Sequence, residues 1–375
     1  MTSTENCLDE VLKSLGLARF EPPPPKAGGF AHVFQVLDER ARARLVELSE
    51  AYADPAAVEF GFAEHREFNA FAQRGAKDVI CLYSASVRAL WSFFNAVMTI
   101  REIFPWIDDV ERLGESAAPP VKGELFFVRN QVSATGEFEP VRLRLARAMF
   151  DVATDFALIH AVGHLRNGHV AFLHQEVGPG PHQEMHPAGA AELGSVALQA
   201  LEFDADSFAA QKVFARVHRE NPFAEFEPGL LKDHRLPIDG AFTASWYFAW
   251  FAIYAYFRLF DEARAAAGVE SGPQPPAALR QACLLSTVAA VGARQGWSSL
   301  SMPNWEVIAT NAGLEAEGAI CRLRRAPMDA KSYIAAWDGR AFDQIEAYMR
   351  AWESLGPRLA AFRKGGAPAQ SEAPS

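Results

Sequence analysis

DFALIHAVGHLRNGH, residues 155–169, places His160 and His164 near the end of a stretch with helical periodicity that runs from Pro140 to Asn167. Gly168 follows, and glycine readily adopts the left-handed conformation in which helices end. On a helix the two histidines lie on one face, about one turn apart. Two imidazoles so placed can bind one metal ion, and zinc accepts such nitrogen ligands in a tetrahedral arrangement. The pair alone is modest evidence, because this spacing often arises by chance on a polar face.

A second predicted helix, Ala190 to Val217, contains the sequence ALEFDADSFAAQ. Glu202 and Asp206 are again four residues apart and share a face. Together with Asp204 they are costly to bury without a partner, so a solvated acidic stripe is the simplest alternative. Both carboxylates nevertheless lie on the same side as apolar neighbours. If Glu202 is the third ligand, Asp206 is spaced to hydrogen-bond the far nitrogen of a ligating histidine.

In this order the two motifs resemble those of the gluzincin metallopeptidases, whose signature is His-Glu-x-x-His on one helix and Glu-x-x-x-Asp on a later one. The local sequences HAVGHLRNGH and LEFDADSFAA look like peptidases of the HtpX type and phage-exclusion peptidases of the Lit type. The resemblance covers the stretch from Asp155 to Ala210. It implies zinc as the cofactor, Asp206 as the residue that orients a ligand, and three zinc ligands, His160, His164 and Glu202. His169 lies off the ligand face, beyond Gly168, and is not expected to bind the metal.

The chain departs from this family at Ala161. The family has a glutamate there, which takes a proton from metal-activated water and passes it to the leaving amine. Loss of a positioned base typically costs roughly a hundred- to ten-thousand-fold in rate, although zinc keeps some Lewis-acid function. We therefore expect a zinc-binding and nearly inactive chain. Either a deliberate Glu-to-Ala change or a natural pseudopeptidase explains this, and we favour the first because the ligands and Asp206 are all retained.

Other parts of an active site are less well defined by the sequence. A donor for the oxyanion is expected from another segment. The eligible residues, which the sequence does not rank, are His182, His186, His234, Tyr247 and Arg258. A strand predicted at Gly123–Val132 is either an edge strand that pairs with an extended substrate or an ordinary core strand. The loop Glu176–Gly189 joins the two metal helices and could cover the cleft.

The whole pattern predicts an α+β fold, predominantly α-helical, with a small antiparallel sheet and a metallopeptidase-like active-site helix. Further helices are predicted over Val33–Ala53 and Val79–Ile103. The aromatic-rich run Thr243–Phe257 is predicted to be a buried core helix, because it falls short of the roughly 20 residues that a membrane-spanning helix needs. The expected organisation is an irregular, proline-rich lead-in (1–30), a helical N-terminal region (31–120), a metallopeptidase-like domain (121–363) and a disordered tail (364–375).

Composition limits the expected partners and the cellular compartment. The 375 residues carry a formal net charge of −10, and no basic patch favours nucleic acid or an anionic membrane as a partner. The 4 cysteines are scattered, without the paired spacing of a disulfide framework or a cysteine metal cluster. The first residues lack the basic start and apolar run of a secretory signal, so we expect a cytoplasmic protein.

The leading hypothesis is a zinc-dependent endopeptidase acting on a protein or peptide substrate, disabled here by Ala161. The Lit-like resemblance implies a role in bacterial defence against phage. One alternative is a zinc-binding pseudopeptidase that acts as a peptide- or protein-binding module, and another is a helical interaction protein without metal. An oxygen-using iron site is a further alternative, because two histidines and one carboxylate also suit iron. The oligomeric state is left open.

Overall fold

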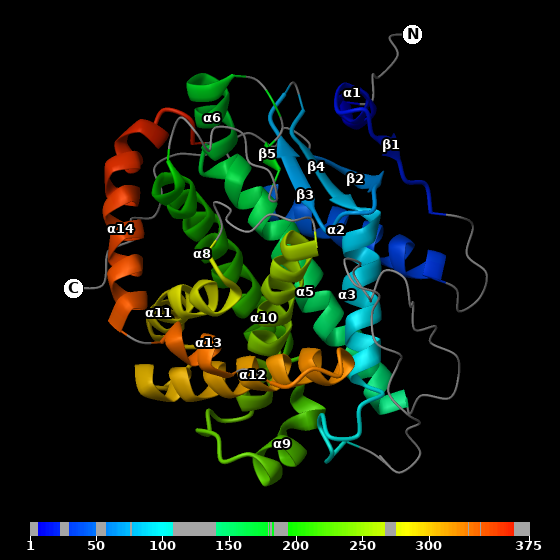
Figure 1. Cartoon of the computed structure of the whole chain (residues 1–375), viewed down its shortest axis with the longest axis vertical. Coiled ribbons are helices and arrows are strands. Elements are labelled where there is room, and N and C mark those ends of the chain that lie inside the picture. Colours follow the sequence, from blue (N-terminus) through cyan, green and yellow to red (C-terminus); the bar gives the residue numbers. More distant parts are fainter. Residues whose placement is uncertain are drawn as a thin grey trace.

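The structure of the chain is a computed structural model that describes residues 7–22, 30–49, 58–75, 77–107, 140–178, 180, 182–183, 194–266, 275–328, 330–337 and 339–363. Helices dominate it, and a small sheet with α1 lies at one side of the helical layer (Figure 1). This confirms a predominantly helical α+β fold. The strand predicted at Gly123–Val132, most of the proline-rich segment and the tail 364–375 lie outside the described residues.

Two long helices, α5 (Pro140–Arg166) and α8 (Ser195–Glu220), form the centre of the fold. They run antiparallel, because Asp155 near the middle of α5 contacts Arg216 near the end of α8, whereas His164 faces Glu202 near its start. Both helices confirm the predictions from periodicity, and Gly168 has the expected positive φ of 87°.

The remaining helices pack around this pair. Helix α10 contacts α5 and α12, while α8 is also covered by α11 and α14 (Figure 1). Their bounds are α10 Thr243–Ala266, α11 Ala277–Gln295, α12 Met302–Leu323 and α14 Gly339–Leu359. Shorter helices are α6 His169–Val177, η2 Ala224–Phe226, α9 Glu227–Asp233 and α13 Ala330–Ala335. At the N-terminal side lie α1 Cys7–Ser14, α2 Phe30–Ser49 and α3 Ser84–Val97.

Helix α10 contains the aromatic-rich run and is a core helix, as predicted. Its residues from Trp246 to Tyr256 are all at most 2% exposed. None of the helices in the described ranges combines the length and the apolar character needed to cross a lipid bilayer.

A buried carboxylate in α5 forms ion pairs with residues of α2 and α8. Asp155 of α5 is 1% exposed and lies 3.1 Å from Arg40 and 3.4 Å from Arg44, both of α2. Arg216 of α8 contacts its other side at 2.9 Å. Because a buried charge must be paired, this cluster fixes how α2, α5 and α8 are placed along one another.

The sheet has 5 strands in the order β1-β2-β4-β3-β5. Their bounds are β1 Ala18–Arg19, β2 Glu59–Glu64, β3 Ala70–Gln73, β4 Val79–Tyr83 and β5 His182–Gln183. The pairs are antiparallel except β2 with β4, which are parallel, so the sheet is mixed where antiparallel pairing throughout was expected. One face packs against the main core, and α1 covers the other.

Two local predictions differ from the structure. The single helix predicted over Val79–Ile103 is wrong at its start, because Val79–Tyr83 is the buried strand β4 and α3 begins at Ser84. A short apolar run buried on both faces cannot be distinguished from a buried helix by periodicity. The lead-in predicted to be irregular contains helix α1 and strand β1, and α1 packs its Leu8 and Leu12 under the sheet.

Candidate metal centre

The two metal helices approach closely because a glycine lies between the histidines. A Cβ atom on Gly163 would lie 3.2 Å from the Cα of Ala205 and 3.3 Å from its carbonyl oxygen. A larger residue would therefore push α5 and α8 apart. The small side chains at this contact bring the histidine face of α5 within reach of the carboxylate face of α8.

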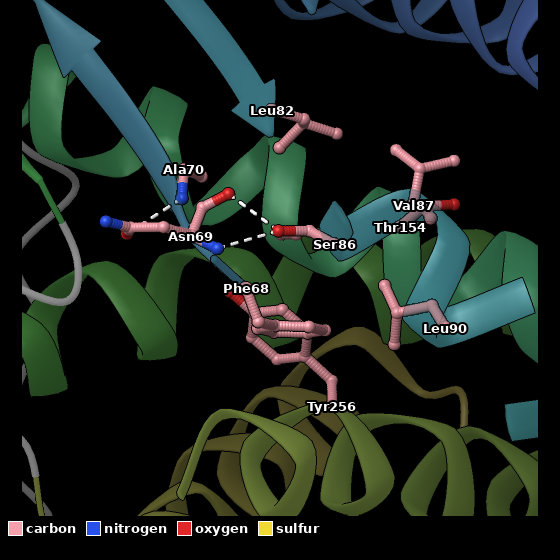
Figure 2. A pocket seen from close by; sticks show the side chains of 10 residues that line it. Phe68, Asn69, Ala70, Leu82, Ser86, Val87, Leu90, Thr154 and Tyr256 are labelled. Atoms are coloured by element: carbon pink, nitrogen blue, oxygen red, sulfur yellow. Dashed lines mark hydrogen bonds between the residues drawn. The ribbon is translucent and has the colours of Figure 1, made fainter. Parts of the chain in front are cut away.

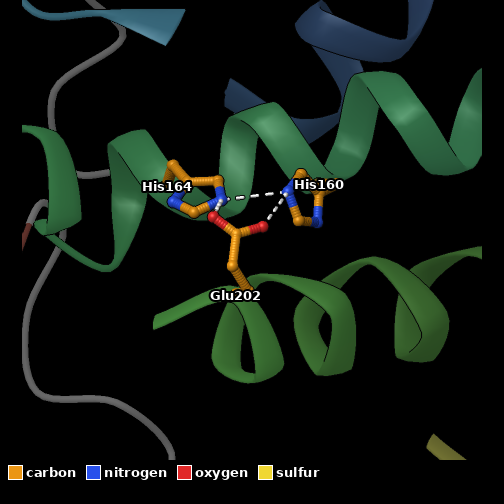
Figure 3. Close-up of side chains that lie close together, drawn as sticks. All are labelled: His160, His164 and Glu202. Carbon is orange, nitrogen blue, oxygen red and sulfur yellow. Dashed lines mark hydrogen bonds and ion pairs between the residues drawn. The ribbon is translucent and has the colours of Figure 1, made fainter. Parts of the chain in front are cut away.

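His160 and His164 point from α5 toward Glu202 on α8, as Figure 3 shows. The two Nε2 atoms are 2.9 Å apart. Glu202 lies 3.4 Å from Nε2 of His160 through one oxygen and 3.6 Å from Nε2 of His164 through the other. One donor atom from each residue lies within 4.8 Å of the others, and all three residues are buried. The structure thus brings together the three residues predicted as ligands.

Asp206 lies behind His160, where the sequence placed it. Its Oδ1 is 2.8 Å from Nδ1 of His160, which makes an ion-pair contact between two buried side chains. Arg280 of α11 holds Asp206 from the other side with two hydrogen bonds of 2.8 and 2.7 Å, and its guanidinium stacks on Phe257. Burial alone would lower the pKa of Arg280, but the Asp206 carboxylate raises it above its usual value. Arg280 was missed in the sequence, since nothing local marks a residue 74 positions away.

His164 is held in a similar way by a second chain of contacts. Its Nδ1 is 3.1 Å from Nδ1 of His169, whose Nε2 is 3.1 Å from Asp204. Asn167 donates a hydrogen bond of 2.7 Å to the same carboxylate oxygen. His169 is not on the ligand face of α5, as expected, but Gly168 ends that helix and the next one turns His169 back toward His164.

One placement of the ring protons suits metal binding. A proton on Nδ1 of His160, directed at Asp206, would leave a lone pair on Nε2 of that ring. A proton on Nε2 of His169, directed at Asp204, would let Nδ1 of His169 accept the Nδ1 proton of His164. With this placement both Nε2 lone pairs face each other and the Glu202 carboxylate, an arrangement that a bound cation would stabilise. The donor set therefore fits a metal ion.

The pKa shifts at the centre favour a neutral His164 and an ionised Glu202. Burial, followed by the neighbouring imidazole of His182, lowers the pKa of His164 well below its usual value and keeps the ring neutral. Burial alone would raise the pKa of Glu202, but the surrounding imidazoles, His164 first, lower it well below its usual value. Neutral imidazole and ionised carboxylate are the forms that bind metals.

The candidates for an oxyanion donor separate into groups. His182 lies at the centre, with its Nε2 3.2 Å from Glu202. His234 and Tyr247 stack on each other at the α9–α10 contact, with ring centroids 5.6 Å apart. Arg258 pairs with Glu262 and Glu317 between α10 and α12. His186 lies outside the described residues, as does most of the loop expected to cover the cleft.

Ala161 occupies the position at which the resemblance expected a glutamate. It is next to His160 on α5, is 3% exposed and belongs to the main hydrophobic core. Its methyl group can neither accept nor donate a proton. The three candidate ligands therefore have no proton acceptor beside them at position 161.

A small cavity lies further toward the start of α5 (Figure 2). Its lining includes Thr154 and Ala157 of α5 and Tyr256 of α10, with Asn69 and Ser86 joined to each other by hydrogen bonds of 2.7 Å. None of the lining residues carries a charge, so the cavity contributes no acid, base or metal ligand to the centre.

Comparison with known proteins adds no assignment to this geometry. No protein-family model, curated protein or solved structure matches the chain. A functional interpretation of the centre therefore depends on the arrangement of its own residues.

Proposed function

We propose that the chain is a zinc-binding protein of the metallopeptidase type, with His160, His164 and Glu202 as the ligands. The observation that carries the proposal is the convergence of these three buried donors with the far nitrogen of each histidine already held by another side chain. A chance pair of histidines on a polar face would not be expected to have such support.

Zinc is the metal that this donor set favours in the proposal. Two imidazoles and one carboxylate form a common catalytic zinc set, and the ligands come from two rigid helices. Iron uses the same donor types, so the metal must be identified by measurement. Elemental analysis of protein purified without added metal should give about one zinc per chain. His160→Ala should lose the metal, whereas His234→Ala, the same exchange at the residue that follows α9, should keep it.

The proposed reaction is hydrolysis of peptide bonds in a protein substrate. Zinc in this position would polarise the scissile carbonyl and make the attacking water more acidic. Asp206 and His169 would orient the two imidazoles, and Glu202 would supply a negative charge. No group at Ala161 can take the proton of the water, so this chain should hydrolyse peptides very slowly. The Lit-like resemblance adds defence against phage to the proposal.

Replacing Ala161 with glutamate tests the catalytic part. Ala161→Glu should give chelator-sensitive cleavage of unfolded protein substrates, with a gain of about a hundredfold or more over the parent chain. Ala161→Gln is the matched control, because it has the same size without a base. Equal and negligible activity of both variants, with zinc still bound, would overturn the peptidase assignment.

A zinc-binding pseudopeptidase is the second candidate, and Ala161 is the observation that favours it. In that case the metal centre stabilises a surface that binds a peptide or a partner protein. Zinc would remain bound in Ala161→Glu without any gain in hydrolysis, so the same experiment distinguishes the two functions.

A further inference from the structure

We propose that His182 is a fourth protein ligand of the metal, contributed by strand β5. The inference rests on the metal binding in the proposed function but not on peptidase activity. In this proposal a residue of the segment between α5 and α8 binds the metal ion directly.

Strand pairing determines the direction in which His182 points. Strand β5 pairs antiparallel with β3, in the register Ala72 with His182 and Phe71 with Gln183. Directly paired residues have their side chains on the same face of a sheet. Ala72 belongs to the main core, which includes α5, whereas Phe71 packs on the opposite face with α1. His182 therefore extends toward α5 and the metal ligands.

The contacts of the His182 ring place it beside Glu202 and His164, next to the three donors that all lie within 4.8 Å of one another. Its Nε2 is 3.2 Å from Oε1 of Glu202, the same oxygen that lies 3.6 Å from Nε2 of His164. The rings of His164 and His182 have centroids 4.2 Å apart. With His182 only 4% exposed, the imidazole is enclosed with the three other donors rather than directed to solvent.

Nδ1 of His182 differs from the far nitrogens of the other two histidines. It is buried and has no hydrogen-bond partner among the described residues. By contrast, Nδ1 of His160 lies 2.8 Å from Oδ1 of Asp206, and Nδ1 of His164 lies 3.1 Å from Nδ1 of His169. A ligating imidazole normally has its other nitrogen hydrogen-bonded, which fixes the ring and raises its basicity. His182 is thus the weakest and the most easily displaced of the four ligands.

A fourth ligand changes what the centre can do. Three imidazoles and one carboxylate complete a tetrahedral zinc site, whereas catalytic sites keep one position open. Strand β5 also occupies the edge of β3, the kind of position where an extended peptide can add as a strand. In this arrangement a substrate must displace His182 before its carbonyl can reach the metal.

Cobalt substitution tests the ligand directly, because Co²⁺ reports the number and type of its ligands by visible absorption. The full chain loaded with Co²⁺ should show the intense bands of a four-coordinate site. His182→Ala should shift and weaken these bands and lower Co²⁺ affinity by about tenfold or more. His182→Cys should add a thiolate-to-metal charge-transfer band in the near ultraviolet, which only a directly bound residue produces. His234→Ala, which changes a histidine that makes no contact with the three candidate ligands in the described structure, should keep the Co²⁺ spectrum and affinity of the parent chain.

The outcomes separate this inference from the function on which it rests. If His182→Ala keeps the parent spectrum and affinity, and His182→Cys shows no charge-transfer band, then His182 only hydrogen-bonds Glu202 and the inference is wrong. That result would leave the three-ligand site intact. A parent chain that binds neither Zn²⁺ nor Co²⁺ would overturn both. Circular dichroism of the metal-free variants shows whether a lost spectrum reflects misfolding, and a folded His182→Cys remains decisive if His182→Ala is unstable.

Discussion

Asp206 links the metal centre to the helix packing, so changing it should affect both metal affinity and stability. The carboxylate lies 2.8 Å from Nδ1 of His160 and accepts two hydrogen bonds from Arg280, which is 3% exposed. Asp206→Asn keeps the shape but removes the charge that fixes the proton on Nδ1 of His160. Loss of such an orienting carboxylate typically lowers metal affinity by about 10- to 100-fold, or about 1.4–2.7 kcal/mol.

Asp206→Ala should have a second effect that Asp206→Asn shows less strongly. Removing one partner of a buried ion pair typically costs about 3–5 kcal/mol, because the other charge is left without compensation. Here that charge is the Arg280 guanidinium between α8 and α11. The metal-free alanine variant should therefore unfold at a lower denaturant concentration than the metal-free parent, with an unchanged dependence on denaturant.

The assay combines zinc competition against a chromophoric chelator with urea unfolding of the metal-free proteins. Asp233→Asn, the same exchange in α9, is the control and should change neither quantity. A zinc dissociation constant of Asp206→Asn within about twofold of the parent would refute the role given to Asp206. Unchanged stability of Asp206→Ala would separately refute the claim that the Arg280 pair holds α11 against α8.

Three further predictions follow from the packing around the centre. Gly163→Val should destabilise the chain by about 1–3 kcal/mol and weaken zinc binding, because the valine side chain would meet the backbone of Ala205. Gly356→Ala in α14 is the control, because a Cβ atom there has open space. In the same urea and zinc titrations this variant should be neutral or slightly stabilising. Gly168→Ala should cost about 1–2 kcal/mol from its positive φ alone, and more because a Cβ there would lie 2.8 Å from the backbone of Phe362; a melting temperature equal to that of the parent would contradict this. Removing the metal with a chelator should lower the free energy of unfolding by about 4 kcal/mol, relative to protein with free zinc at roughly a thousand times its dissociation constant. An unchanged melting temperature in calorimetry after the chelator is added would contradict a structural contribution of the ion.

The ligand set could be predicted because its information is local. His160 with His164, and Glu202 with Asp206, each repeat at the spacing of one helical turn, and that spacing determines a shared face once a helix forms. The contact between Asp206 and His160 could be predicted for the same reason. The apolar residues beside Glu202 and Asp206 indicated that these carboxylates do not lie on an exposed face, and both are buried in the structure.

The rest of the centre depends on contacts that no local pattern encodes. Arg280 reaches Asp206 only through the packing of α11 on α8. His169 was excluded by helical geometry, yet the turn at Gly168 starts a new helix and brings it to His164. His182 was one of several unranked candidates, because its strand is 2 residues long and exists only through pairing with β3. The strand Val79–Tyr83 was misassigned for a related reason, since burial on both faces removes the alternation that marks a strand.

Ala161 and His182 bear on the same question from different elements of the fold. The first removes the proton acceptor on α5, and the second brings a further donor from the sheet to within 3.2 Å of Glu202. Ala161 and His182 both favour metal binding over metal-dependent catalysis. They are not equivalent, however, because a methyl group cannot be converted into a base by any movement of the chain, whereas a histidine on a short edge strand can be displaced. In a chain with glutamate at position 161, His182 would cover the metal in the absence of a peptide. The metal would be exposed when a peptide replaces β5 on β3. With alanine there, the same displacement would expose a metal that could bind the peptide carbonyl without hydrolysing the bond, which is the behaviour that the proposed binding module requires.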